Sequence, residues 1–199
     1  MIGLVGCPGA GKSTLAMALR HTFAGICQIV PMDGFHLANV ELARLGRSSR
    51  KGAPDTFDSA GYVAMLERVR HQSEAETIYA PEFRREMEEP IAGAIPVAPG
   101  TQLIITEGNY LLLNEGAWAK IPTLLDDIWY VNVEQNLRTD RLVKRHEEFG
   151  RSRKAAIDWV TTTDEPNARL IAASQVRADH LFSWDHMGDN FRTREPENA

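Results

Sequence analysis

Close to its N-terminus the chain reads Gly6-Cys7-Pro8-Gly9-Ala10-Gly11-Lys12-Ser13. The spacing is G-x-x-x-x-G-K-[ST], in which the glycines let the backbone fold closely around a ligand. The amide groups of such a loop point inward and form a nest for phosphate oxygens. The start of the following helix adds the positive end of its dipole, and the lysine adds a full charge. Residues 6–13 therefore predict a loop that binds phosphate groups.

The sequence on either side of this loop has the structure that the motif requires. The apolar run Ile2–Val5 comes before it, and residues 14–23 follow with apolar side chains at helical spacing. We therefore expect residues 6–13 and Thr14 to bind ATP. In this arrangement Lys12 reaches the β and γ phosphates and the Ser13 hydroxyl binds Mg²⁺. ATP and Mg²⁺ are the expected cofactors.

Short apolar runs alternate with amphipathic stretches along the rest of the chain. Because these runs lack polar alternation, they are typical of a parallel sheet that is covered on both faces. The sequence predicts a three-layer α/β/α fold of the P-loop NTPase type, with a five-stranded, mostly parallel sheet. We expect strands at residues 2–5, 26–30, 103–105, 128–133 and around 181–182, and helices at 14–23, 61–71, 136–149 and 168–176.

The length of 199 residues is that of one domain. We expect a single kinase-sized domain over residues 1–189 and a flexible tail at 190–199. Two segments rich in proline, glycine or arginine, residues 44–60 and 77–99, are expected to leave the sheet on the substrate side. A small helical lid is expected at about residues 138–154.

Lys and Arg number 22 against 27 Asp and Glu, which gives a net charge of −5. This balance is unfavourable for a protein that binds nucleic acid or an anionic membrane. The chain has no apolar run of membrane-spanning length, and no basic segment precedes Ile2–Val5. We therefore expect a cytoplasmic protein with a small-molecule substrate, and leave a homodimer open. Residues 44–51 and 138–154 are basic islands, which are either parts of an anion site or solvated faces.

Other features narrow the class of phosphate-binding protein. The chain has no Asn-Lys-x-Asp motif of the kind that reads guanine in GTPases. Asp58-Ser59-Ala60-Gly61 matches D-x-x-G, but no apolar strand precedes it, so we interpret it as the start of a helix. Motor and AAA-type ATPases are larger. A small-molecule kinase fits best.

Two acidic residues follow predicted strands. Asp33 and Glu107 each lie at the carboxyl end of a strand, where open α/β sheets bind their ligands. Asp33 could accept the proton of an attacking hydroxyl, and its alternative role is to cap the next helix. Glu107 could hold the water shell of Mg²⁺ or be an ordinary solvated side chain. His36 either contacts the substrate or caps the helix that follows.

Several further motifs carry a resemblance to a known family. They are Gly6–Ser13, Met32–His36 with Asn39, Arg50–Asp58, Tyr79–Arg85 and Glu107–Tyr110. Over most of its length the chain resembles the P-loop kinases that include uridine kinase, phosphoribulokinase and bacterial-type pantothenate kinase. It is most similar to their nucleoside/nucleotide-kinase-like branch, some members of which are regarded as fructose kinases. The resemblance implies transfer of the ATP γ phosphate to a hydroxyl of a small metabolite.

The resemblance also implies roles for individual residues. Asp33 matches the catalytic base. Lys51 and Arg85 match residues on the acceptor side, although Phe83-Arg84-Arg85 stands where fructokinase-like relatives have Phe-Asp-Arg. The expected acceptor site also includes His36, Glu107 and Tyr110. Arg141, Arg145 and Arg151 resemble the arginines of the family's lid: the first two are expected to act in catalysis and the third to bind the nucleotide.

The sequence leaves the acceptor and two other functions open. The acceptor could be a sugar such as fructose, a pantothenate-like alcohol or a nucleoside. One alternative is a nucleoside monophosphate kinase, in which a phosphate is the acceptor. The other is a non-catalytic ATP-binding regulator, which would need no base at Asp33.

Overall fold

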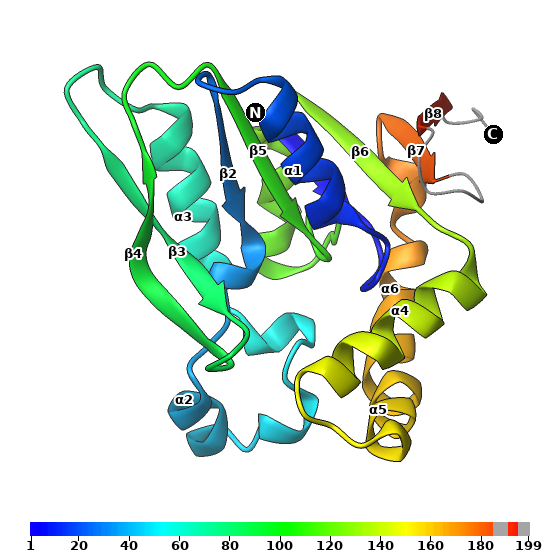
Figure 1. Cartoon of the computed structure of the whole chain (residues 1–199). Helices are drawn as coiled ribbons and strands as arrows, with labels where there is room; N and C mark the ends of the chain where they lie inside the picture. The colour runs from blue at the N-terminus through cyan, green and yellow to red at the C-terminus, as the bar shows by residue number, and fades with distance from the viewer. Residues whose placement is uncertain (185–190, 195–199) are drawn as a thin grey trace.

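The computed structural model describes residues 1–184 and 191–194, and its centre is a twisted sheet (Figure 1). Within the described residues the strand order of this sheet is β2-β5-β1-β6-β7-β8. The first five of these strands are parallel, as the sequence predicts. They are β1 (Ile2–Val5), β2 (Cys27–Pro31), β5 (Leu103–Gly108), β6 (Asp127–Asn132) and β7 (His180–Trp184).

The sheet has one strand more than expected. Strand β8 (Phe191–Arg194) pairs antiparallel with β7, with Leu181 opposite Arg194. These four residues belong to the segment predicted as a flexible tail, and they pair here because an open sheet edge offers backbone partners to an extended segment. Residues 190 and 195–199, the remainder of that prediction, lie outside the described residues.

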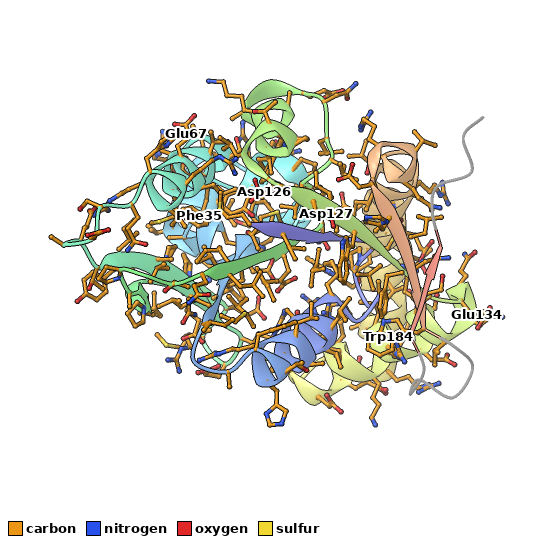
Figure 2. The ribbon with its side chains drawn as sticks, turned by 90° about the horizontal axis from the view of Figure 1, so that it is seen from above. Phe35, Glu67, Asp126, Asp127, Glu134 and Trp184 are labelled. Atoms are coloured by element: carbon orange, nitrogen blue, oxygen red, sulfur yellow. The ribbon has the colours of Figure 1, made fainter. Side chains whose placement is uncertain are left out.

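Helices cover both faces of the sheet. Helix α1 (Lys12–Thr22) lies on one face, and α3 (Ser59–Arg70) lies on the other with the 3₁₀ segment η4 (Gly116–Leu124) (Figure 2). The buried residues Leu4 and Val5 of β1 belong to cores on opposite faces. Consecutive strand residues point to opposite faces, so a strand buried on both sides has no polar alternation.

The start of α3 settles the interpretation of the D-x-x-G match. The Asp58 side chain caps this helix and accepts a hydrogen bond of 2.8 Å from the backbone N–H of Gly61. As the sequence analysis predicts, this motif is a helix start. No helix among the described residues is both long enough and apolar enough to cross a membrane.

The first predicted excursion lies at the end of the sheet where the parallel strands stop, and the second runs alongside the sheet so that its tip reaches the same end (Figure 1). Residues 77–99 form an antiparallel hairpin of β3 (Ile78–Arg84) and β4 (Glu89–Val97). The hairpin packs tightly on the turn η1 (Met32–Phe35), where a Cβ on Gly34 would lie 2.3 Å from the carbonyl oxygen of Pro81. The other excursion contains α2 (Asn39–Arg44) and the 3₁₀ turns η2 (Ser48–Arg50) and η3 (Pro54–Thr56).

The segment across from these excursions is helical, and we call residues 135–172 the lid. It is longer than the predicted range of 138–154. It consists of α4 (Gln135–Glu148), α5 (Arg153–Trp159), the π-helical turn η5 (Val160–Asp164) and α6 (Glu165–Ala172). A short 3₁₀ turn, η6 (Gln175–Arg177), leads from the lid towards β7.

A buried ion pair fixes the base of the lid. Arg138 of α4 donates a hydrogen bond to Glu165 of α6, and their side chains are 7% and 20% exposed. A Cβ on Gly9 would lie 3.0 Å from the carbonyl oxygen of Arg138, so the base of the lid abuts the phosphate-binding loop. Nη1 of Arg138 is buried and has no hydrogen-bond partner among the described residues. The arginine therefore depends heavily on Glu165.

We predict that Glu165→Ala lowers the free energy of unfolding by about 3–5 kcal/mol, because it leaves the buried guanidinium of Arg138 without its counter-charge. Urea denaturation measures the change. Glu147→Ala is the matched control, because it breaks the lid's exposed pair with Arg153, whose side chains are 34% and 74% exposed. That control should cost about 0–1 kcal/mol. Equal losses in the two variants would contradict the structural role of the buried pair.

Candidate active site

A cavity of about 890 Å³ lies between the carboxyl ends of the strands, the two excursions and the lid. Most of the predicted site residues line it. From the loop and α1 these are Pro8, Gly9, Gly11, Lys12, Ser13 and Thr14. From the strand ends and the excursions they are Asp33, His36, Lys51, Arg85 and Glu107, and from the lid they are Arg141, Arg145 and Arg151.

The loop of residues 6–13 has the backbone shape that phosphate binding requires. Gly9 and Gly11 have φ values of 81° and 86°, which side-chain-bearing residues rarely adopt. A Cβ on Gly11 would lie 2.7 Å from Nε1 of Trp184, and that indole N–H donates a 2.8 Å hydrogen bond to the carbonyl oxygen of Ala10. The loop is thus held from outside by β7, and its shape fits a bound nucleoside triphosphate.

Lys12 is buried within this loop. Its ammonium donates hydrogen bonds to the carbonyl oxygens of Gly6 at 2.9 Å and Cys7 at 3.1 Å, and to Oδ1 of Asn109 at 2.8 Å. Burial lowers the pKa of Lys12, although the nearby charges of Glu107 and Asp33 oppose this effect. The lysine joins the loop after β1 to the end of β5.

Ser13 and Glu107 form the pair expected for magnesium. The Ser13 hydroxyl donates a 3.0 Å hydrogen bond to Oε1 of Glu107. Burial, together with the negative charge of Asp33, raises the pKa of Glu107. The described residues contain no group of three or more His, Cys, Asp or Glu side chains placed to hold a metal ion. One hydroxyl and one carboxylate fit Mg²⁺ that is otherwise bound by water and phosphate oxygens.

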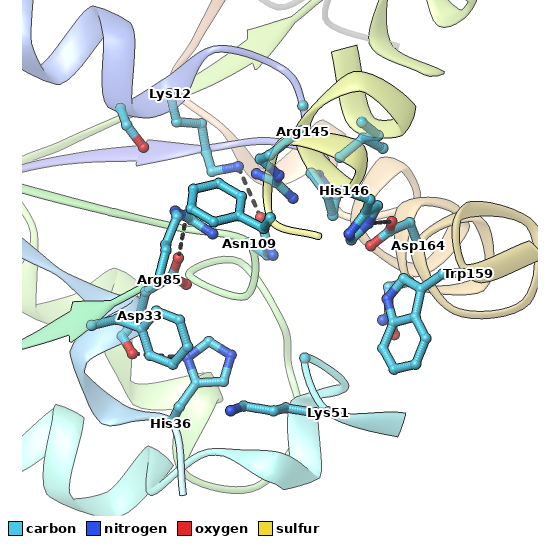
Figure 3. Close-up of a pocket in the computed structure, with 18 of the residues that line it drawn as sticks. Lys12, Asp33, His36, Lys51, Arg85, Asn109, Arg145, His146, Trp159 and Asp164 are labelled. Atoms are coloured by element: carbon cyan, nitrogen blue, oxygen red, sulfur yellow. Dashed lines mark hydrogen bonds and ion pairs between the residues drawn. The ribbon is translucent and has the colours of Figure 1, made fainter. Parts of the chain in front are cut away.

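Asp33 lies at the end of β2, among positive groups. Its Oδ2 atom is 3.4 Å from the Arg85 guanidinium of the hairpin (Figure 3). Burial by itself would raise the pKa of Asp33, but the positive charges around it, among them those of Arg85, Lys12 and Arg145, outweigh burial and hold the pKa below its ordinary value. The carboxylate is therefore ionised at neutral pH.

His36 follows on the same turn and is enclosed by aromatic rings. Its ring centre lies 4.0 Å from that of Phe57 and 4.5 Å from that of Phe83. Nδ1 is 2.8 Å from the carbonyl oxygen of Asp33, which can only accept, so Nδ1 carries a proton. Because burial lowers the pKa of His36, the ring is neutral and its Nε2 is a hydrogen-bond acceptor.

Lys51 comes from the first excursion and is largely engaged by protein groups. It donates a 2.7 Å hydrogen bond to Oδ1 of Asn39 and a second hydrogen bond to the carbonyl oxygen of Glu88. Its ammonium also lies 3.8 Å from the Glu88 carboxylate and 5.2 Å from the centre of the Phe83 ring. These contacts tie the first excursion to the tip of the hairpin.

The lid arginines differ in their surroundings. The guanidinium groups of Arg141 and Arg145 line the cavity and make no hydrogen bond or ion pair with any described residue. The guanidinium of Arg151 instead packs over the ring of Trp159, 3.9 Å from its centre. Arg138, which the helical spacing places on the same face as Arg141 and Arg145, faces Glu165 rather than the cavity.

The structure adds cavity residues that our list of candidate residues lacks. Asn109 binds the ammonium of Lys12, and His146 forms a 2.9 Å pair with Asp164, where Trp159 and Asn167 also line the cavity. Asn109 comes two residues after Glu107, and Asn167 stands beside a proline at a helix start, so both carried a weak local signal. No sequence pattern joins His146 to Asp164, which are 18 residues apart.

Tyr110 is a correction to the predicted acceptor site. Its side chain is fully buried among Phe57 and Trp118, and its hydroxyl donates to the carbonyl oxygen of Gly52. Burial raises the pKa of Tyr110. It does not line the cavity but supports the excursion that carries Lys51, because a tyrosine can place its ring in the core and still satisfy its hydroxyl.

Three of the loop residues predicted to bind the nucleotide are not among the residues that line the cavity. Gly6, Cys7 and Ala10 form the underside of the loop, where Gly6 and Cys7 accept from Lys12 and Ala10 accepts from Trp184. The Cys7 thiol lies 3.4 Å from the Tyr130 hydroxyl and from the carbonyl oxygen of Ala168.

The sequence model of the phosphoribulokinase/uridine kinase family matches residues 1–185. The chain belongs to this family. It is a P-loop kinase by sequence and fold.

Similar proteins include kinases with different names. The ATP-dependent kinase-like protein notR' of Aspergillus versicolor is 35% identical, over 80% of this chain and 98% of its own length. A candidate uridine kinase of Schizosaccharomyces pombe is 33% identical, over 90% of this chain and 80% of its own. The crystal structure of a candidate fructose transport system kinase from Silicibacter sp. has a TM-score of 0.82 and 38% identity, covering 92% of this chain and 88% of that one.

We predict that Lys12→Met lowers ATP turnover by at least about 10²-fold, because a buried cation among the loop carbonyls is replaced by a neutral chain of similar length. A coupled assay of ADP release measures the effect. Lys120→Ala, an exposed lysine on η4, is the control and should leave turnover unchanged. Full activity in Lys12→Met would contradict the assignment of the loop.

Proposed function

We propose that this protein transfers the γ-phosphoryl group of ATP to a hydroxyl of a small metabolite. The observation that carries this proposal is the ionised carboxylate of Asp33, which lines the same cavity as the loop lysine and is surrounded by cationic side chains. A base at this place has a use when the acceptor is an alcohol, because the alcohol must lose its proton. A phosphate acceptor would arrive already ionised and would need no base.

We assign the following roles to the chain's own residues. The loop amides and Lys12 hold the β and γ phosphates. A bound Mg²⁺ would supply positive charge to the phosphate oxygens, and Ser13 with Glu107 would hold it. Arg141 and Arg145, whose guanidinium groups line the cavity without an ion pair to a described residue, stabilise the charge of the transferring group. Asp33 orients the attacking hydroxyl and accepts its proton.

The acceptor lies in the remaining part of the cavity. Lys51, His36 and Arg85 are lining residues there, with the aromatic ring of Phe83. The bond between the γ phosphorus and the β,γ-bridging oxygen breaks as the bond to the acceptor oxygen forms. The acceptor classes are a sugar such as fructose, a pantothenate-like alcohol and a nucleoside.

We expect Asp33→Asn to lower kcat by about 10²–10⁴-fold, because the amide keeps the shape of the side chain and removes the base. The KM for ATP should change little, because Asp33 is not one of the phosphate-binding groups. Steady-state kinetics with the best acceptor of a metabolite panel measures both quantities. Asp140→Asn, an exposed position on α4, is the control for the same chemical change. An unchanged kcat in Asp33→Asn would refute general-base catalysis by this residue.

The acid limb of the pH–rate profile gives a second test. Arg85 is one of the charges that hold the pKa of Asp33 low, so Arg85→Gln should raise that pKa. The base then becomes protonated at a higher pH, and the acid limb of kcat/KM should move towards neutral pH. Arg84→Gln is the matched control, since this neighbouring arginine pairs with Glu82 and Glu86 on the exposed side of the hairpin. Coincident profiles for the two variants would contradict the coupling of Arg85 to Asp33.

A further inference from the structure

We infer that Asp164 determines acceptor specificity by binding hydroxyl groups, and that the acceptor is an uncharged polyhydroxyl compound such as a sugar. The identity of this ligand as the phosphate acceptor rests on the proposed function. The binding site itself rests on the contacts of the lid.

A group of cationic side chains surrounds Asp33 in the part of the cavity near the loop. Lys12 and Arg145 are each close enough to Asp33 to lower its pKa, and Arg85 contacts it. This group of charges faces the phosphates that the loop holds. It is therefore matched to the transferring group and gives no reason for the acceptor to be an anion.

Farther from the loop, the lysine that lines the cavity is Lys51, and its ammonium is already bound by protein groups. Lys51 binds Asn39 and Glu88, as described above, so a carboxylate on the acceptor would have to displace them and approach the Glu88 carboxylate. His36 is neutral and presents Nε2 as an acceptor. This end of the cavity thus offers groups that receive hydrogen bonds from hydroxyls.

Asp164 offers the same chemistry from the opposite side. In Figure 3 it lies with His146 and Trp159 across the cavity from His36 and Lys51. Only 11% of its side chain is exposed, and Oδ2 is bound to Nε2 of His146 at 2.9 Å. No hydrogen bond to a described residue occupies Oδ1. A buried carboxylate with one occupied oxygen is fixed in direction and retains acceptor capacity for a ligand.

The backbone that carries Asp164 supports a binding role. Asp164 is the last residue of η5, a π-helical turn between α5 and α6, and such turns are often found at functional sites. The wider turn brings the carboxylate to the cavity wall beside Trp159 and Asn167. One face of this indole carries the guanidinium of Arg151. The rest of its apolar surface, beside hydrogen-bonding groups, suits the apolar face and hydroxyl edge of a sugar.

The surrounding charges favour hydroxyls over other ligands of a carboxylate. An ammonium group would have to approach Arg145, whose charge interacts with that of Asp164. A carboxylate would be repelled by Asp164 itself. Hydroxyl groups suffer neither penalty, and a compound with several of them has donors for both Asp164 and His36, which line the same cavity.

Titration calorimetry tests this inference without turnover. The compounds are D-fructose, D-glucose and D-ribose, against pantothenate, D-glycerate and uridine, each with Mg²⁺ and a non-hydrolysable ATP analogue. We expect a sugar to bind the unmodified protein. Asp164→Asn should raise the Kd for that sugar by about 10- to 100-fold, the range for loss of a hydrogen bond to a charged group. Asp158→Asn, an exposed lid position that does not line the cavity, is the matched control and should bind normally.

Monodeoxy analogues of the sugar that binds give a second measurement, which does not depend on the folding of the variant. On the unmodified protein, one analogue should bind about 10- to 100-fold more weakly than the parent sugar, the same factor as for Asp164→Asn. On Asp164→Asn, that analogue and the parent sugar should bind with equal affinity. The inference is overturned if Asp164→Asn and Asp158→Asn bind alike, or if the protein binds only pantothenate, D-glycerate or uridine. Sugar binding that depends on Asp164 without any phosphorylation would instead refute the proposed function and leave the binding site established.

Discussion

The site depends on one buried positive charge. Lys12 is only 7% exposed, and its ammonium donates hydrogen bonds to two loop carbonyls and to Asn109. A buried cation without acceptors would be very costly, so the loop after β1 and the end of β5 must stay together. That junction also sets Ser13 beside Glu107. The shape of the loop and the position of Ser13 beside Glu107 are consequences of the same constraint.

Two carboxylates at neighbouring strand ends acquire opposite properties from their surroundings. Burial and the charge of Asp33 raise the pKa of Glu107, whereas the positive groups around Asp33 outweigh burial and lower its pKa. Such a separation commonly distinguishes the roles of paired acids in an active site. Asp33 is suited to accept a proton, and Glu107 gains most from an added cation, since a positive charge beside it removes the cost of its burial.

The sequence is sufficient to bring candidate site residues together when they are close in the chain or when the topology places their strand ends side by side. The loop of residues 6–13 is contiguous, and Asp33 and Glu107 meet because parallel strands end at one edge. His146 and Asp164 could not be paired in this way, because a helix, a loop and a π-helical turn separate them. Tyr110 was misassigned because a residue next to a motif can face the core, and β8 was missed because edge pairing leaves little trace in composition.

This difference explains why the family fixes the reaction more firmly than the substrate. The phosphate half of the cavity comes from one loop and two strand ends, so it is determined wherever the fold and the motif occur. The acceptor half is assembled from the hairpin, the first excursion and the lid, which are held together by side-chain contacts such as Lys51 with Glu88. Changes in these three segments can alter the acceptor without disturbing Lys12 or Ser13. Relatives with similar loops can therefore bind different acceptors, and the residues that distinguish them are to be sought on the lid and the hairpin.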